Sequence, residues 1–203
     1  MLGSAGVQVR GPGKGAMSAP SSITVRNAAP GDATGIARVH VASWRSTYPG
    51  IVPDQYLVNL STPLYAERWR GMLAMGPRGG RETFVAVEPG GEILGFATCG
   101  PQRTAIEGYG GEFYALYLYD HAQGQGLGRR LMGAMAGDLL GRGVRSACVW
   151  VLRDNPARWF YERLGGMRLA EQPISFAGAR LEEVCYGWRD LAPLARASAM
   201  RES

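Results

Sequence analysis

The sequence predicts one α/β domain in which helices cover both faces of a largely antiparallel sheet. Three observations support this class. Strand-like runs recur along the chain, amphipathic helical segments alternate with them, and several strands are joined by short glycine turns of the kind that link antiparallel neighbours. With 203 residues, of which 46% are hydrophobic and 19% charged, the chain can form one good core but not two domains of ordinary size.

The N-terminal half begins with a tail and then becomes mainly helical. Residues 1–22 are rich in Gly, Ser, Ala and Pro and predict a flexible tail, in which Met17 offers a second start. Residues 23–28 alternate as a first strand, and Asp32 is a candidate N-cap for the helix that follows. The apolar face of that helix is predicted at Ile36, Val39, His40, Ser43 and Trp44. A short helix is expected from Asp54 and another over 63–74.

The C-terminal half supplies most of the predicted sheet. The expected strands are 84–87, 93–100, 113–119, 147–152, 167–176 and 180–188, which makes about seven with the first. Glu88-Pro89-Gly90-Gly91 predicts a hairpin turn between the first two of these strands. A short helix is expected over 156–164, with Pro156 at its first position. Residues 192–203 predict a frayed C-terminal tail, which leaves 23–191 as the folded domain.

One stretch of this half indicates an anion site. The apolar strand 113–119 leads into a loop with glycine at 124, 126 and 128, and a helix follows. The apolar positions of the helix are Leu131, Met132, Met135, Leu139 and Leu140. The first N–H groups of a helix lack partners and carry partial positive charge, and glycines let the backbone approach a phosphate closely. We therefore expect a ligand that carries phosphates.

The spacing within the loop narrows the choice of ligand. A nucleoside-triphosphate loop needs Gly-Lys-Ser/Thr, but Gly128 is followed by Arg129 and Arg130. A dinucleotide loop needs Gly-x-Gly-x-x-Gly, whereas this loop reads Gly-x-Gly-x-Gly, so an oxidoreductase with Asp154 on the ribose is a weaker alternative. The remaining interpretation is Gln-x-x-Gly-x-Gly from Gln123 to Gly128, which resembles the acetyl-CoA pyrophosphate loop of the GCN5-related N-acetyltransferases.

A second stretch makes the resemblance more specific. Asn155, Ala157, Phe160, Tyr161 and Gly165 resemble the region after that family's fifth strand, with a small shift in spacing between the asparagine and the alanine. The segments VHVASWRSTYPGIVPDQYL and EEVCYGWRDL are also similar, so the likeness covers roughly residues 23–191. The resemblance implies the acyl-CoA N-acyltransferase fold, a three-layer α/β/α domain around a mixed, mostly antiparallel sheet, with acetyl-CoA as cosubstrate.

The resemblance also implies which residues bind the cofactor. They are Leu118, Tyr119, Gln123, Gly124, Gln125, Gly126, Leu127, Gly128, Arg129 and Asn155. The backbone of Leu118 and Tyr119 would pair with the pantetheine arm, and the Leu118 N–H is the candidate oxyanion donor. Arg129 would bind phosphate, with Arg130 as a second candidate. Asn155 would contact the arm, although it is equally well placed to cap the next helix.

Tyr161 and Glu112 are the candidate catalytic residues. A phenol is protonated at neutral pH and can donate to the leaving thiolate, so Tyr161 is the expected general acid, unless it only packs on its helix. Glu112 would take the amine's proton through water, or would be an exposed strand-end carboxylate, with Glu107 as a substitute base. The acceptor side is expected at Trp44, Tyr48 and Arg103, and this arginine would favour an acceptor that bears a carboxylate or phosphate.

Composition excludes some other classes of function. The net charge of +5 and pI near 9.4 come from dispersed arginines, so nucleic-acid binding is not expected. The three cysteines are far apart in apolar runs and form no zinc motif, so no metal is expected and the thiols are predicted to be buried and reduced. No stretch approaches the length of a membrane span, and a cytoplasmic location is expected.

The sequence thus predicts an N-acetyltransferase that moves acetyl from acetyl-CoA directly to a primary amine of a small molecule or peptide. A non-catalytic acetyl-CoA sensor would keep the glycine loop but would lack a working acid and base. The identity of the amine is left open, because loop and helix surfaces select it. A homodimer is a further expectation, formed through the edge of the last two strands.

Overall fold

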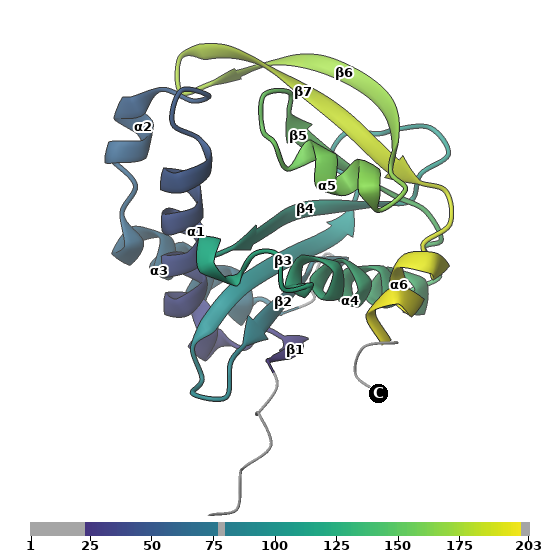
Figure 1. Cartoon of the computed structure of the whole chain (residues 1–203), viewed down its shortest axis with the longest axis horizontal. Coiled ribbons are helices and arrows are strands. Elements are labelled where there is room, and N and C mark those ends of the chain that lie inside the picture. The colour runs from purple at the N-terminus through teal and green to yellow at the C-terminus, as the bar shows by residue number, and fades with distance from the viewer. Residues whose placement is uncertain (1–22, 77–79, 200–203) are drawn as a thin grey trace, which may run out of the picture.

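The computed structural model describes residues 23–76 and 80–199, which form a seven-stranded sheet in the order β1-β2-β3-β4-β5-β7-β6 (Figure 1). The strands are β1 (Thr24–Asn27), β2 (Glu82–Val87), β3 (Ile93–Pro101), β4 (Gly111–Leu118), β5 (Ala147–Leu152), β6 (Met167–Phe176) and β7 (Ala179–Trp188). The helices are α1 (Ala33–Thr47), α2 (Asp54–Val58), α3 (Thr62–Ala74), α4 (Leu127–Gly141), α5 (Arg158–Arg163) and α6 (Ala192–Ala199). The element order predicted for residues 23–191 is therefore confirmed.

The centre of the sheet contains the feature that makes room for a ligand. All neighbouring strands are antiparallel except β4 and β5, which are parallel. These two strands pair over only three residues each, Gly111–Phe113 of β4 with Ala147–Val149 of β5. The register of β4 against β3 shifts at this level, so that Tyr114 is an extra residue, which is the pattern of a β-bulge. Beyond Phe113 the two strands separate, and β4 is left with an unpaired edge.

Helices cover both faces of the sheet, which confirms the predicted three-layer arrangement. One face is covered by α4, whose buried Leu131, Met132, Met135 and Leu139 carry the helical period expected from the sequence. The opposite face is covered by α1 and α3, with Ile36 and Val39 packed on β2 and β3.

A long hairpin of β6 and β7 extends from the far side of the sheet across to α1 and α2 (Figure 1). Phe176, at its tip, lies 5.7 Å from Trp44 and 4.7 Å from Tyr56 between ring centroids. The hairpin turn places Ala177 and Gly178 at positive φ, the conformation of a tight type I′ connection. This contact turns the gap between β4 and β5 into a walled cleft.

The structure near the C-terminus differs from the frayed tail predicted over 192–203. Ala192–Ala199 form α6, which lies beside α4 (Figure 1). Leu191 is fully buried and Leu194 is 5% exposed, so this short apolar segment completes the core on the α4 face. The predicted tail over 1–22 and the last four residues, 200–203, lie outside the described residues.

The prediction that the Asp32 side chain caps the first helix is wrong. This side chain makes no capping bond to α1 and instead accepts a hydrogen bond from the Ala29 N–H (2.7 Å) and pairs with Arg26 (2.7 Å). The guanidinium of Arg26 lowers the pKa of this carboxyl. Asp32 thus holds the turn that precedes the helix rather than the helix end itself.

The edge of the sheet bears on the expected homodimer. β6 is the outermost strand and carries Pro173, which has no N–H to donate to a further strand. Pairing through this edge stays a prediction.

Within 23–76 and 80–199 no helix is long and apolar enough to cross a membrane, and no group of three His, Cys, Asp or Glu side chains is placed to hold a metal ion.

Candidate functional site

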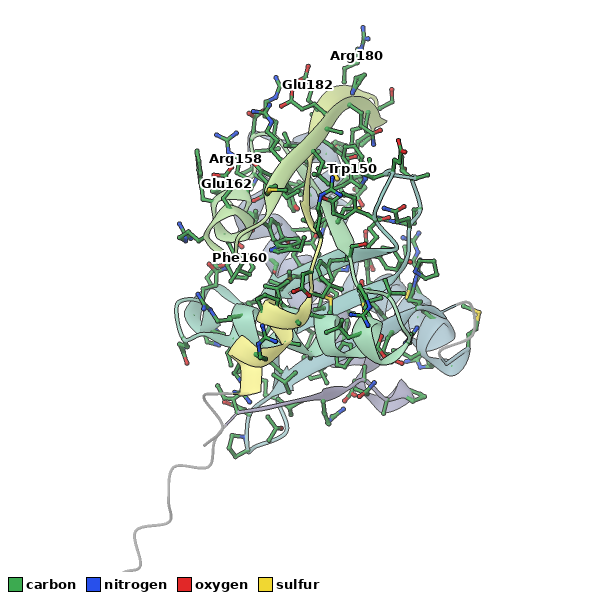
Figure 2. The ribbon with its side chains drawn as sticks, turned by 90° about the vertical axis from the view of Figure 1, so that its right-hand side faces the viewer. Trp150, Arg158, Phe160, Glu162, Arg180 and Glu182 are labelled. Atoms are coloured by element: carbon green, nitrogen blue, oxygen red, sulfur yellow. The ribbon has the colours of Figure 1, made fainter. Side chains whose placement is uncertain are left out.

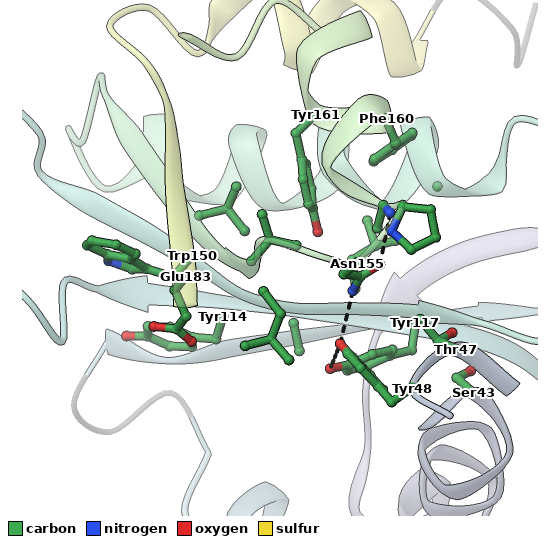
Figure 3. Close-up of a pocket in the computed structure, with 18 of the residues that line it drawn as sticks. Ser43, Thr47, Tyr48, Tyr114, Tyr117, Trp150, Asn155, Phe160, Tyr161 and Glu183 are labelled. Atoms are coloured by element: carbon green, nitrogen blue, oxygen red, sulfur yellow. Dashed lines mark hydrogen bonds between the residues drawn. The ribbon is translucent and has the colours of Figure 1, made fainter. Parts of the chain in front are cut away.

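A cleft of about 900 Å³ lies where β4 and β5 separate, bounded by α1, the start of α4, α5 and the β6–β7 hairpin (Figure 3). It brings together most of the site residues that the sequence predicts. Those that line it are Trp44, Tyr48, Arg103, Glu112, Leu118, Gln123, Gly124, Gly126, Gly128, Arg129, Asn155 and Tyr161. Residues more than 100 positions apart in the sequence therefore share one cavity.

The glycine loop forms one end of the cleft. Gly124 and Gly126 have φ values of 73° and 82°, which L side chains rarely adopt, and Gly126 is the residue from which α4 starts. At Gly128 a Cβ atom would lie 3.3 Å from the Phe160 ring, so a side chain there would crowd α5. No side chain caps α4, and its first N–H groups are available to a ligand in the cleft.

The two arginines after the loop have different surroundings. Arg129 is exposed on the cleft wall, and no described residue forms a hydrogen bond or ion pair with it. Arg130 instead donates to the Ile23 carbonyl (2.8 Å), on the β1 side of the helix. A cation in the first turn opposes the helix dipole, so Arg129 is best accommodated when an anion lies beside it. Phosphate binding is thus better supported for Arg129 than for Arg130.

The open edge of β4 presents backbone donors to the cleft. The Tyr119 N–H donates to the Leu94 carbonyl (2.9 Å) on the β3 side. Because antiparallel ladders use every second residue, the Leu118 N–H faces the opposite edge, from which β5 has departed. The Leu118 carbonyl accepts from Ser43 Oγ (3.0 Å), which anchors this residue to α1. Of the two residues whose backbone is predicted to pair with the cofactor, Leu118 directs its N–H to the open edge, whereas the Tyr119 N–H is already bonded to β3.

Asn155 connects the two walls of the cleft. Its Oδ1 accepts from the Ala157 N–H (2.8 Å) at the entry to α5, and its Nδ2 donates to the Tyr48 hydroxyl (3.1 Å). The hydroxyls of Tyr48 and Tyr117 lie 3.3 Å apart, which extends the chain of hydrogen bonds to β4 (Figure 3). The helix itself begins at Arg158, later than the Pro156 expected from the sequence, because the Asn155 turn precedes it.

Tyr161 extends from α5 into the cleft, with its hydroxyl directed toward the open space (Figure 3). The residue is 6% exposed, and burial raises the pKa of its phenol well above the ordinary value of 10. No described residue forms a hydrogen bond with this hydroxyl. A protonated phenol without a protein partner can donate its proton to a bound ligand.

Glu112 differs from an exposed strand-end carboxylate. It is fully buried, it accepts from the Arg103 N–H (2.8 Å) and Nε (2.9 Å), and a further contact from Nη2 completes the ion pair. The two predicted site residues are therefore partners of one another. Since the charge of Arg103 is compensated, the arginine is a weaker basis for recognising an acidic acceptor than the sequence indicates.

One wall of the cleft is not predicted by the sequence. Its side chains come from the bulge of β4, from β5 and from the β6–β7 hairpin: Tyr114, Trp150, Gln172, Ile174, Phe176 and Glu183. Alternation along β5 and β7 places Trp150 and Glu183 on one face, but strand periodicity alone does not say which face is the cleft. Only the pairing of the strands reveals this wall.

Other predicted positions lie outside the cleft lining. Leu127 is buried in the core, and Gln125 is exposed and donates from Nε2 to the His121 carbonyl (2.8 Å), which shapes the loop. Their backbone N–H groups stay predicted cofactor contacts. Asp154 is exposed and absent from the lining, and the largely antiparallel sheet differs from the parallel one of dinucleotide-binding folds, so the oxidoreductase interpretation is wrong.

Comparison with known sequences agrees with the resemblance to the GCN5-related N-acetyltransferases. Residues 102–173 match the family model described as FR47-like protein. The chain is 42% identical over 172 residues to the uncharacterized N-acetyltransferase YuaI of Bacillus subtilis (strain 168), an alignment that covers 85% of this chain and 96% of that one. This is a relationship over nearly the whole of both proteins, so it extends beyond the glycine loop.

Solved structures with low identity share the fold. An acetyltransferase of the GNAT family from Desulfovibrio desulfuricans superposes with a TM-score of 0.63 at 24% identity and covers 84% of this chain and 100% of its own. YncA from Salmonella typhimurium, solved with acetyl-CoA, gives 0.61 at 20% identity, with 84% and 95% covered. The sequence relationship, the fold and the cleft agree, and the chain belongs to the GCN5-related N-acetyltransferases, a family of acyltransferases that use acetyl-CoA.

Proposed function

We propose that this protein transfers acetyl from acetyl-CoA directly to a primary amine, with Tyr161 as the general acid. The observation that carries the proposal is the Tyr161 hydroxyl, which has no hydrogen-bond partner among the described residues and lies in the same cleft as the glycine loop. A sensor that only binds acetyl-CoA has no need for a buried, unpartnered acid in its binding cleft.

The cofactor would extend from the glycine loop along the open edge of β4. Its pyrophosphate would bind the free N–H groups at the start of α4, with Arg129 adding charge-assisted hydrogen bonds. The pantetheine arm would replace the missing strand beside Leu118, with Asn155 on the other side. This path directs the thioester toward Tyr161.

The chemistry would proceed through a tetrahedral intermediate. A neutral amine attacks the thioester carbonyl, the Leu118 N–H stabilises the oxyanion, and the C–S bond breaks as Tyr161 donates its proton to the sulfur. Because burial raises the pKa of Tyr161, the phenol is protonated at neutral pH and so has a proton to donate. Glu112 would accept the proton lost by the amine, through water, while Arg103 holds the carboxylate in place.

Titration calorimetry followed by acetyl-transfer kinetics tests this assignment. We expect acetyl-CoA to bind and NAD not to bind. In Tyr161→Phe, kcat for thiol release should fall about 100-fold, because a general acid contributes at least that much, while the Kd of acetyl-CoA stays the same. Tyr109→Phe is the matched control, since it removes a buried hydroxyl that has no partner and lies outside the cleft.

Three results would contradict the proposal. Acetyl-CoA binding without acetylation of any amine in a broad panel would indicate a sensor. Full activity in Tyr161→Phe would show that the acid is another group or water. If neither acetyl-CoA nor NAD bound, the cofactor assignment itself would fail.

A further inference from the structure

We propose that the acceptor carries a second positive charge, and that Glu183 binds this charge beside Trp150 at the far end of the cleft. The proposal rests on the proposed function, since it names the class of amine that the transferase uses. It follows from the charges and partners of the side chains that line the cleft.

Glu183 directs its carboxylate into the cleft from β7. Figure 3 shows it beside Trp150 and Tyr114, at the end opposite Tyr48. Its side-chain partner is a neutral amide, because Gln172 Nε2 donates to it at 3.3 Å across the hairpin. Within the described part of the chain, no arginine or histidine forms an ion pair with Glu183. A half-buried carboxylate with one neutral partner retains capacity for a cation.

The neighbouring carboxylates are already compensated. Glu112, which shares the cleft, is paired with Arg103. Glu182 projects from the outer side of the hairpin (Figure 2) and is paired with Arg153. Glu183 is thus the acidic residue of the lining whose charge has no counterpart, and a ligand cation would supply one.

Trp150 supplies a second feature that favours a cation. Its half-buried indole lies against this part of the cleft, where the ring face can attract a desolvated ammonium or guanidinium group. The Tyr114 ring already faces Arg81 and Arg103, with guanidinium carbons 4.8 and 4.7 Å from its centroid. Trp150 is the neighbouring ring over which no arginine of the described residues lies.

The charges also differ between the two ends of the cleft. Arg129 lies at the glycine loop, where phosphates are expected, and Glu183 lies at the end where the acceptor would enter. An acceptor with a carboxylate beyond its amine would place that group near Glu183 and be repelled. This reverses the preference for an acidic acceptor that Arg103 suggests in the sequence.

The test compares acceptors of equal length that differ at one end. Linear diamines are each paired with the monoamine in which a methyl replaces the second ammonium, and with the amino acid in which a carboxylate replaces it. For the wild type we expect kcat/KM to be at least about tenfold higher for the best diamine than for its monoamine, since a partly desolvated charge pair contributes about 1.4 kcal/mol or more. The amino acid should be the poorest acceptor.

Glu183→Gln is the informative variant, because it removes the charge and keeps an oxygen for Gln172. It should raise KM for the diamine about tenfold and leave the monoamine unchanged. Glu182→Gln, the outward-facing neighbour, is the control and should behave as the wild type. Calorimetric titration of the same diamine and monoamine into protein loaded with coenzyme A gives a readout that does not depend on turnover.

The outcomes separate this inference from the proposed function. If no amine is acetylated but the diamine binds the wild type more tightly than Glu183→Gln, the charge site stands and the catalytic assignment fails. If amines are acetylated but Glu183→Gln lowers kcat equally for diamine and monoamine, Glu183 acts on the reacting amine and the charge site is wrong. Equal binding of diamine and monoamine to the wild type would also overturn it.

Discussion

His40 lies on α1 among five aromatic rings, those of Trp44, Tyr65, Trp69, Phe96 and Tyr117. Its Nδ1 is buried without a hydrogen-bond partner, and burial lowers the pKa of the imidazole to about 4. The sequence predicts His40 on the apolar face of its helix, and its ring contacts with α3 and the sheet confirm that packing.

This burial predicts a specific acid sensitivity. Between about pH 4 and pH 6.5 the unfolded chain binds a proton at His40 that the folded chain does not, so the free energy of unfolding should fall as the pH is lowered through this window. In His40→Gln this part of the pH dependence should disappear. Urea unfolding at several pH values measures it, and the exposed His121→Gln is the control. An unchanged slope in His40→Gln would contradict the prediction.

At the scale of elements, the sequence predicted the strands and helices up to residue 191 with errors of a few residues. The periodicity of Leu131, Met132, Met135 and Leu139 was sufficient for α4, because a helix of that length has a repeating apolar face. α6 was missed because eight residues with small side chains have little pattern of their own. Its helix depends on the docking of Leu191 and Leu194 against α4.

We expect the docking of α6 to contribute measurably to stability. Leu194→Ala should lower the free energy of unfolding by roughly 2–4 kcal/mol, the range for deleting most of a buried leucine side chain. Arg196→Ala, on the exposed side of the same helix, should change it by less than about 0.5 kcal/mol. Chemical denaturation of the two variants provides the comparison. A result for Leu194→Ala as small as that for Arg196→Ala would show that α6 is not docked in solution.

At the scale of the whole molecule, the three cysteines occupy buried strand positions outside the cleft lining, and two of them pack against the inner side of its wall at Trp150. Cys99 lies on β3, where burial raises its pKa to about 12, and Cys148 and Cys185 are buried in a separate cluster on β5 and β7. None of the three lines the cleft. This arrangement favours direct transfer within a ternary complex over an acyl-cysteine intermediate.

Direct transfer makes predictions for the initial-rate kinetics and for the mass of the intact protein. Initial rates measured against both substrates should give intersecting double-reciprocal plots, and intact mass spectrometry after incubation with acetyl-CoA alone should show no covalently added acetyl group. Denatured protein treated with an acetylating reagent is the positive control. Parallel plots together with an acetylated cysteine that reacts on to the amine would overturn direct transfer.

The order of elements, the glycine loop and the helix it starts can be inferred from the sequence alone, because each depends on local periodicity or on backbone conformations that few residues adopt. The sequence also placed Tyr161 and Asn155 beside that loop through a resemblance rather than through geometry. Which polar groups of the cleft are paired and which are free follows only from the three-dimensional fold. Strand register and the separation of β4 from β5 bring Arg103 to Glu112 and turn the Leu118 N–H to the open edge. They also leave the half-buried Glu183 beside Trp150 without a cationic partner. Charge pairing is a property of three-dimensional distance, which residue spacing along the chain does not specify.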